Sequence, residues 1–275
     1  MIISIASGKG GTGKTTIATS LALSIEHGQF LDCDVEEPNA HLFLKPEKEK
    51  VETVSVTVPE VDMNLCTHCG ECGKICQFKA IVSVKKSLLL FPQLCHSCGG
   101  CIKACPSGAI KEVEREIGII ESGRVKDIEF HHGILNIGEA KSPPLIKALK
   151  KKINNSNTVI IDSPPGTSCP VITSVRGSDY VILVTEPTPF GLNDLILAVE
   201  MVKTLLIPSG IIINRSDIGD REVFLYCERE NIPILMEIPN NREVAEGYSK
   251  GKTLVETLPE LKEKFRELFK NIKRS

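Results

Sequence analysis

The chain contains two runs of four cysteines, and the spacing of the cysteines would allow each run to supply ligands to an iron–sulfur cluster. Both runs follow the pattern C-x2-C-x2-C-x3-C, and their members are Cys66, Cys69, Cys72, Cys76, Cys95, Cys98, Cys101 and Cys105. The second run repeats the first 29 residues later, and the repeat extends to Ala80, Ile81 and Val84, which return as Ala109, Ile110 and Val113. Four thiolates at this spacing suit a cubane cluster, so the segment is predicted to be an internal duplication that binds two [4Fe–4S] clusters.

The ligand sets are predicted to cross between the runs, because in two-cluster ferredoxins the fourth cysteine of one run ligates the other cluster. One predicted set is Cys66, Cys69, Cys72 and Cys105, and the other is Cys95, Cys98, Cys101 and Cys76. Zinc is an alternative, but a zinc site takes four ligands, whereas this segment offers four plus four at cluster spacing. Disulfides in a secreted chain are the remaining alternative.

A glycine-rich segment near the start of the chain could bind the phosphates of a nucleotide. It satisfies G-x4-G-K-[ST] and stands directly after an apolar strand and at the start of a helix, which is the place that a phosphate-binding loop occupies. The alternative is a glycine-rich turn without a ligand, which would not need this placement. Glycine N–H groups can cradle phosphate, Lys14 can place its charge on the terminal phosphates, and the Thr15 hydroxyl can ligate Mg²⁺. The predicted binding residues are Gly8, Lys9, Gly10, Gly11, Thr12, Gly13, Lys14, Thr15 and Thr16.

The run from Lys9 to Thr16 resembles the deviant Walker A motif of the MinD, ParA, Mrp and nitrogenase iron-protein superfamily. The mark of that motif is an extra lysine just after the first glycine, and Lys9 occupies this place. The resemblance implies that Lys9 contacts phosphate across a dimer interface and that ATP lies between two copies of the chain. The plainer interpretation of Lys9 is a solvated loop residue.

Two acidic segments extend the resemblance. Asp32-Cys33-Asp34 resembles the switch I motif of the superfamily and implies that Asp34 orients the attacking water, so Lys9, Lys14 and Asp34 are the predicted catalytic residues. The segment from Val159 to Gly166 resembles Walker B and switch II, and implies that Asp162 holds Mg²⁺ through water. Either Asp34 or Asp162 could instead cap a helix where a strand ends.

Asn214 and Pro239 are the predicted contacts to the base. Asn214 ends an apolar strand, and an asparagine at this place contacts adenine in the superfamily, although N-x-x-D also resembles the guanine-specifying motif of GTPases. Pro239 follows another short strand, where the superfamily places a second base-contacting segment. The family resemblance favours adenine, and ATP with Mg²⁺ is therefore the predicted ligand.

Short apolar runs that alternate with helical patterns must position these residues. Strands are expected at residues 2–6, 30–33, 51–58, 158–161, 181–185, 211–213 and 234–238, and helices at 14–26, 145–153, 192–206 and 220–231. This alternation predicts an α/β fold with a mostly parallel, doubly wound sheet of the P-loop NTPase type.

The cysteine segment interrupts this alternation, and the alternation resumes after it. The sequence therefore predicts a P-loop ATPase domain of residues 1–58 and 114–275, with a small ferredoxin-like α+β domain of residues 59–113 inserted in it. Residues 118–130 are expected to form the hairpin that leads back into the sheet, with Gly123 between its two apolar–polar runs.

Composition excludes some classes of partner. The 275 residues carry a formal net charge of −2, with Lys and Arg spread along the chain, so no nucleic-acid partner is expected. No apolar stretch approaches 18 residues and no signal peptide precedes Met1, so a soluble, cytoplasmic protein is expected. Cluster thiolates also favour a reducing compartment.

Three further cysteines and the final segment are open to more than one interpretation. Cys169 lies seven residues beyond Asp162, at the spacing of a bridging-cluster ligand in the nitrogenase iron protein, but no second cysteine occurs in residues 114–157. It is expected to be a small packed residue or a redox-responsive thiol, and Cys33 and Cys227 to be structural. An apolar stripe in residues 261–272 is expected to pack on the sheet, with a membrane-binding helix as the alternative.

The leading functional hypothesis is an ATP-gated electron donor, in which closure of a homodimer on ATP binding is coupled to two [4Fe–4S] clusters. A cluster carrier or metallocofactor-assembly ATPase, as among Mrp-type proteins, is the first alternative. A positioning ATPase that uses its clusters as a redox sensor is the second. The first two hypotheses imply an unidentified redox or cluster-accepting protein as a further partner, whereas the third implies a surface or a partner to which the ATPase binds.

Overall fold

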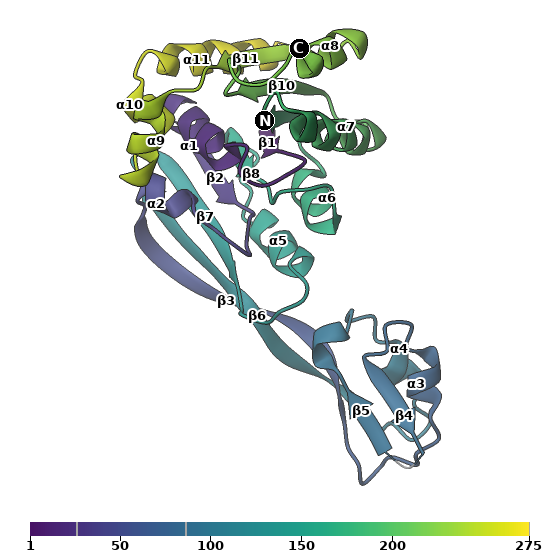
Figure 1. The fold of residues 1–275 in the computed structure, drawn as a ribbon. Helices are drawn as coiled ribbons and strands as arrows, with labels where there is room; N and C mark the ends of the chain where they lie inside the picture. Colours follow the sequence, from purple (N-terminus) through teal and green to yellow (C-terminus); the bar gives the residue numbers. More distant parts are fainter. Residues whose placement is uncertain (26, 86, 275) are drawn as a thin grey trace.

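The structure is a computed structural model that describes residues 1–25, 27–85 and 87–274. A large α/β body contains both termini, and a small module stands apart from it at the end of two long strands (Figure 1). The strands are β1 (Ile2–Ala6), β2 (Gly28–Asp32), β3 (Glu47–Val61), β4 (Ile81–Val84), β5 (Ser87–Leu90), β6 (Ile110–Val125), β7 (Ile128–Leu135), β8 (Val159–Asp162), β9 (Tyr180–Thr185), β10 (Ser209–Asn214) and β11 (Ile234–Ile238).

Helices cover both faces of the sheet, as the alternation in the sequence predicts. They are α1 (Lys14–Ile25), α2 (Ala40–Leu44), α3 (Glu71–Ile75), α4 (Gly100–Lys103), α5 (Pro143–Lys150), α6 (Cys169–Val175), α7 (Pro189–Thr204), α8 (Glu222–Arg229), α9 (Arg242–Ser249), α10 (Leu254–Thr257) and α11 (Leu261–Ile272), with a 3₁₀ turn at Pro92–Leu94. Glu26, the expected end of the first helix, lies outside the described residues.

The main sheet has the strand order β11-β10-β9-β1-β8-β2-β7-β6-β3. All pairs from β11 to β7 are parallel, and β6 and β3 add an antiparallel edge. The predicted mostly parallel, doubly wound fold is confirmed. Because parallel strands end at the same edge, Asp32 at the end of β2 is paired with Asp162 at the end of β8.

Consecutive residues of the central strands bury their side chains in two different cores. In β9, Ile182 and Val184 join the cluster under α1 and α11, whereas Val181 and Leu183 join the cluster under α7 and α8. The closing helix α11 buries Leu261, Phe265, Leu268 and Ile272 in the first cluster. The expected packing of this helix on the sheet is confirmed, and among the described residues no helix is long and apolar enough to cross a bilayer.

The strands β3 and β6 form a long antiparallel ribbon that carries the module (Figure 1). Their pairing runs from Glu47 opposite Arg124 to Val61 opposite Ile110. The predicted domain boundaries fall inside this ribbon, where Val58 is paired with Val113. Beyond it lie α3, α4 and the two-stranded sheet of β4 and β5.

The role expected of Gly123 is wrong. The return hairpin exists, but its turn lies at Lys126 and Asp127, between β6 and β7, and Gly123 is inside β6. A Cβ at Gly123 would stand 2.3 Å from the carbonyl oxygen of Glu47. Glycine is therefore needed there because β3 approaches closely, not because the chain turns.

Candidate functional sites

Two cavities in the module are each lined by four cysteines. The first encloses about 470 Å³ of empty space and is lined by Cys95, Cys98, Cys101 and Cys76. The second encloses about 310 Å³ and is lined by Cys66, Cys69, Cys72 and Cys105. Each cavity thus takes three cysteines from one run and the fourth from the other, in the crossed grouping expected from the sequence. Their role as cluster ligands stays a prediction.

The backbone repeats around the two cavities as the sequence does. Left-handed residues recur 29 positions apart in three pairs, namely His68 and Ser97, Gly70 and Gly99, and Lys79 and Gly108. Gly70 and Gly99 are the residues before α3 and α4, so each run turns into its short helix in the same way. The duplication therefore gives two cysteine loops with similar backbone conformations.

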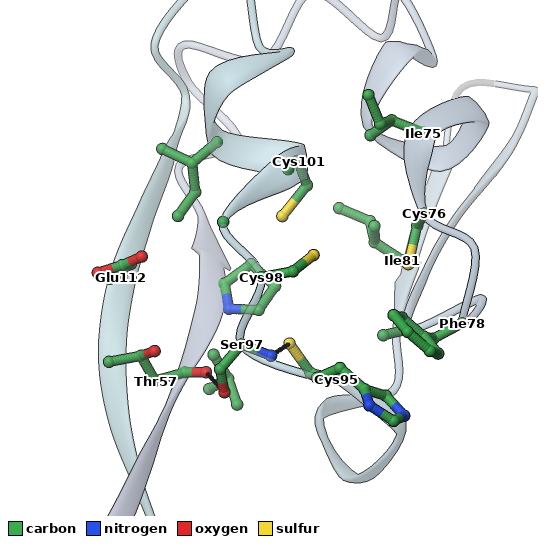
Figure 2. Close-up of a pocket in the computed structure, with 17 residues that line it drawn as sticks. Thr57, Ile75, Cys76, Phe78, Ile81, Cys95, Ser97, Cys98, Cys101 and Glu112 are labelled. Atoms are coloured by element: carbon green, nitrogen blue, oxygen red, sulfur yellow. Dashed lines mark hydrogen bonds between the residues drawn. The ribbon is translucent and has the colours of Figure 1, made fainter.

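The donor chemistry fits a cluster. Figure 2 shows the four cysteines of the first cavity arranged around one space, with Ile75 and Ile81 as apolar walls. Within the described residues, no group of three or more His, Cys, Asp or Glu side chains is placed to hold a single metal ion. Four thiols that line one cavity match the number of cysteine ligands that a [4Fe–4S] cluster takes.

The thiols differ in their surroundings. Burial raises the pKa of Cys72 and Cys101. The Ser107 hydroxyl lowers the pKa of Cys105, whose sulfur also accepts a hydrogen bond from the Ala109 N–H at 3.3 Å. On the first cavity, the Ser97 N–H donates to the Cys95 sulfur at 3.4 Å. Such N–H groups favour a negatively charged sulfur.

A third and larger cavity lies where β1, β2, β10 and β11 end in the body. It encloses about 1340 Å³ of empty space, and the predicted residues that line it are Gly10, Gly11, Gly13, Lys14, Thr15, Thr16, Asp34, Asn214 and Pro239. The remaining predicted residues, Gly8, Lys9, Thr12 and Asp162, are not in its lining. Val244 and Tyr248 of α9 add a wall that the sequence motifs did not indicate.

Asp162 lies directly behind the phosphate loop. Its Oδ2 accepts a hydrogen bond from the Thr15 hydroxyl at 2.6 Å, and its Oδ1 is buried without a partner. Burial raises the pKa of Asp162 to about 7, against the opposing effects of Lys14 and of the Thr15 hydrogen bond. A buried, unpartnered carboxylate oxygen beside a threonine hydroxyl fits a hydrated Mg²⁺ ion, which both oxygens could serve.

The two aspartates of the expected switch I segment have different positions. Asp32 is buried, and its carboxylate accepts the backbone N–H groups of Asp34 at 3.1 Å and Ala40 at 3.0 Å, so it holds the loop. Asp34 faces the large cavity, and burial raises its pKa to about 6, although Lys14 opposes the shift. The helices that follow have Asn39 and Ser168 as N-caps, so neither Asp34 nor Asp162 caps a helix.

Asn214 joins the end of β10 to the phosphate loop. Its side-chain amide donates to the carbonyl oxygen of Thr12 at 2.9 Å. Gly13 has a φ of +94°, and a Cβ there would stand 2.6 Å from the Asn214 amide nitrogen. The glycine is therefore required both by the backbone conformation and by the close approach of Asn214.

Lys9 lies near Glu186, a residue that the sequence motifs did not indicate. Its ammonium lies 4.0 Å from the carboxylate of Glu186, which also accepts a hydrogen bond from Arg215 at 2.7 Å. Glu186 follows β9 with no motif around it, so only the fold could identify it. The action of Lys9 across a dimer interface stays a prediction.

Of the two roles expected for Cys169, the structure is at odds with a small packed residue, and that of a redox-responsive thiol stays a prediction. Its side chain is exposed at the first position of α6, whereas Cys33 and Cys227 are buried. A residue at the start of a short helix need not face the sheet, and Cys169 instead lines a cavity that Cys95 of the module also lines.

Comparisons with known proteins agree with the α/β fold and the phosphate loop of the body. Residues 3–255 match the family model described as the CobQ/CobB/MinD/ParA nucleotide binding domain. An uncharacterised protein of Methanocaldococcus jannaschii is 34% identical over 97% of both chains. An iron–sulfur cluster carrier protein of Aquifex aeolicus is 26% identical over 94% of this chain and 63% of its own length.

The fold has a counterpart among solved structures. The septum site-determining protein MinD of Pyrococcus horikoshii, complexed with Mg-ADP, aligns with a TM-score of 0.59 over 97% of this chain and 93% of its own. The two chains are 21% identical, so the similarity shows a shared fold alone.

Proposed function

Because the chain belongs to the CobQ/CobB/MinD/ParA nucleotide-binding family, whose MinD and ParA members are ATPases, we propose an Mg²⁺-dependent ATPase with a redox role. Nucleotide-driven closure of a homodimer would be coupled to electron transfer through two [4Fe–4S] clusters in the module of residues 59–113. The resemblance of residues 9–16 to the deviant Walker A motif, whose extra lysine acts across a dimer interface, supports the first half of this proposal.

One observation carries the redox half of the proposal. Each module cavity has a full set of four cysteines, and one chain also contains the phosphate-loop cavity. When bound, a [4Fe–4S] cluster takes up and releases one electron at a potential set by its surroundings. The eight thiols would hold two such groups, and Ile75, Ile81 and Ile102 give the first cavity apolar walls.

Different residues of the body have different roles in ATP hydrolysis. Lys14 would neutralise charge on the terminal phosphates, and Thr15 and Asp162 would hold Mg²⁺, which would neutralise further phosphate charge. Asp34 faces the cavity, where it can accept a hydrogen bond from the attacking water. Positioning and charge neutralisation then supply the catalysis.

Lys9 would complete the site of the partner subunit. In one chain alone its ammonium lies near Glu186, 31% exposed, and outside the lining of its own nucleotide cavity. Moving this lysine costs little, because a partly exposed pair 4.0 Å apart is worth at most about 1 kcal/mol. Glu186 would thus hold Lys9 until a second copy with bound ATP arrives.

A cluster carrier is the second candidate. Relatives named iron–sulfur cluster carrier proteins span most of this chain at low identity. Cys69 and Cys98 are exposed, so each cavity has one thiol that an acceptor protein could reach. A positioning ATPase with redox-sensing clusters is less favoured, because α11, the helix that would bind a membrane, buries its apolar face in the body.

The test is anaerobic reconstitution of the full chain, followed by dithionite reduction with and without MgATP. Cluster potentials are measured by EPR, and cluster retention is measured against a chelator and an apo-acceptor protein. A potential that shifts with MgATP while both clusters are retained supports the electron donor. MgATP-dependent loss of a cluster to the acceptor would instead make the protein a carrier.

A further inference from the structure

The loop between β7 and α5, residues 136–142, is bound to the expected switch I segment at both of its ends. The N–H of Leu135, just before the loop, donates to the Val35 carbonyl at 2.9 Å. At the other end the buried Ser142 hydroxyl donates to the Glu36 carboxylate at 2.8 Å. Val35 and Glu36 directly follow Asp34, which faces the nucleotide cavity.

The same loop also contacts the module. The ammonium of Lys141 donates a hydrogen bond to the carbonyl oxygen of Cys95, one of the four cysteines of the first module cavity. Lys141 and Ser142 are neighbours in the chain, so a shift of one changes the position of the other. Pro143 and Pro144 follow at the start of α5, and their fixed φ angles make the joint to the helix stiff.

The middle of the loop is anchored. Glu139 is almost fully buried, with 3% of its side chain exposed, and accepts a hydrogen bond from Arg115 of β6 at 2.6 Å. The Ser97 hydroxyl, two residues after Cys95, donates to the Thr57 carbonyl of β3 at 2.6 Å. These two hydrogen bonds fix the loop to β6 and the segment after Cys95 to β3. The contact of Lys141 with Cys95 is then a polar link whose geometry can change when Ser142 moves.

There is room for that response. An open cavity of about 1150 Å³ of empty space lies beside the link, and Glu36, Cys95, Lys141, Ser142 and Cys169 all line it. Lys141 lines this space, so its ammonium has room to move away from the Cys95 carbonyl. Glu36, which follows the expected switch I segment, and Cys95 of the module thus line one cavity.

We propose that the loop of residues 136–142 couples the nucleotide site to the first module cavity, and that Lys141 is the positioning residue that carries the signal. A change at switch I alters the Ser142–Glu36 hydrogen bond and so moves the Lys141 charge relative to Cys95. A cation near a cluster ligand favours the reduced, more negative state, and its removal lowers the potential. This inference rests on the proposed electron-transfer function and names its internal route.

The first test compares Lys141→Met with Lys147→Met in the full reconstituted chain. Lys147 lines the same cavity and serves as the matched control. Lys141→Met is expected to lower the potential of one cluster without nucleotide and to abolish its MgATP-dependent shift, while Lys147→Met keeps that shift. The coupling route is wrong if the shift survives in Lys141→Met or if both variants lose it equally.

A second test does not need the redox function. Hydrogen exchange of the wild type and of Ser142→Ala is followed with and without an unhydrolysed Mg–ATP analogue. In the wild type, exchange is expected to change in residues 34–37, 136–142 and 93–97, and Ser142→Ala should retain only the first change. A wild-type response confined to residues 34–37, or one that still reaches 93–97 in Ser142→Ala, would overturn the proposed loop.

The two tests separate the two proposals. If neither wild-type cluster responds to MgATP while exchange still reaches residues 93–97 through Ser142, the electron-transfer function fails and the coupling loop stands. If the clusters respond but exchange does not reach this segment, the loop fails and the function stands.

Discussion

The body and the module are stabilised by different means. The body buries its apolar side chains in three clusters on a nine-stranded sheet, and Phe30, Phe130 and Phe265 are almost completely enclosed. The module has one small cluster centred on Cys72, Ile81 and Ile110. A core of this size cannot offset the conformational entropy of about 50 residues. The body therefore folds by burial, whereas the module is expected to need its metal clusters.

Exposure of apolar side chains supports the same contrast. Several large apolar residues of the module are at least 37% exposed, namely Met63, Leu65, Ile75, Phe78, Val84, Leu89, Leu90, Phe91 and Leu94. Among the described residues the body has an equal number at that exposure, but it has about four times as many residues as the module, and the apolar face of its α11 is buried. Metal binding, which becomes folding free energy when a site forms only in the folded state, can make up the difference in the module.

The largest expected effect is the loss of the folded module when one cluster ligand is removed. Cys72→Ala removes both a predicted ligand and a member of the small apolar cluster. Hydrogen exchange should show unprotected residues 62–109, while the body keeps its protection and its nucleotide binding. Cys169→Ser, at an exposed thiol outside both cluster cavities, is the control and should retain both clusters. Equal protection of the module in Cys72→Ala would break the comparison.

The converse change should affect the body alone. Phe265→Ala empties a fully buried site under the sheet and is expected to lower the free energy of unfolding by about 3–5 kcal/mol. Urea unfolding measures this loss, and iron content should remain unchanged. Leu206→Ala, at a side chain that is 90% exposed, should cost less than about 0.5 kcal/mol. A loss of iron in Phe265→Ala would mean that the two parts fold as one unit.

A smaller effect is expected at the ribbon that joins the two parts. Gly123→Ala would place a Cβ 2.3 Å from the Glu47 carbonyl, so β3 and β6 must separate locally. We expect a loss of about 1–3 kcal/mol, because the backbone has to shift. Faster hydrogen exchange at residues 47–50 and 121–124, without loss of iron, would confirm that the ribbon ladder is perturbed and the module is not. Unchanged exchange in these residues would contradict the close approach.

A pH-dependent effect on stability is expected at Asp162. Because the folded protein raises the pKa of Asp162 to about 7, the nucleotide-free fold binds the proton more tightly than the unfolded chain. Its stability should therefore fall as the pH rises from about 4 to 7. Asp162→Asn removes this penalty and should stabilise the nucleotide-free body by about 1 kcal/mol or more.

The same substitution should have the opposite effect on ligand binding. Mg²⁺–nucleotide affinity, measured by calorimetry, should rise with pH up to about 7 in the wild type, because Asp162 must lose its proton to serve the ion. In Asp162→Asn this pH dependence should shrink and the affinity should fall. A variant that is destabilised and yet binds Mg²⁺–nucleotide normally would refute the role of Asp162.

The sequence predicted the features that depend on local pattern. Apolar runs located the strands of the body, and cysteine spacing predicted the two groups of four that the cavities bring together. It missed features that depend on contacts between distant segments. Gly123 is set by the approach of Glu47, and Glu186 lies near Lys9 only because β9 is beside β1. No local pattern marks Lys141, whose partner Cys95 is 46 residues away.

The proposed function requires that nucleotide bound in the body changes the reduction potential of the clusters in the module. The most direct measurement is an anaerobic, EPR-monitored redox titration of the reconstituted chain with and without MgATP, with Lys14→Ala as the nucleotide-binding control. We expect MgATP to shift the potential of at least one cluster in the wild type while both clusters are retained, and we expect no shift in Lys14→Ala. Identical potentials with and without MgATP in the wild type would contradict it.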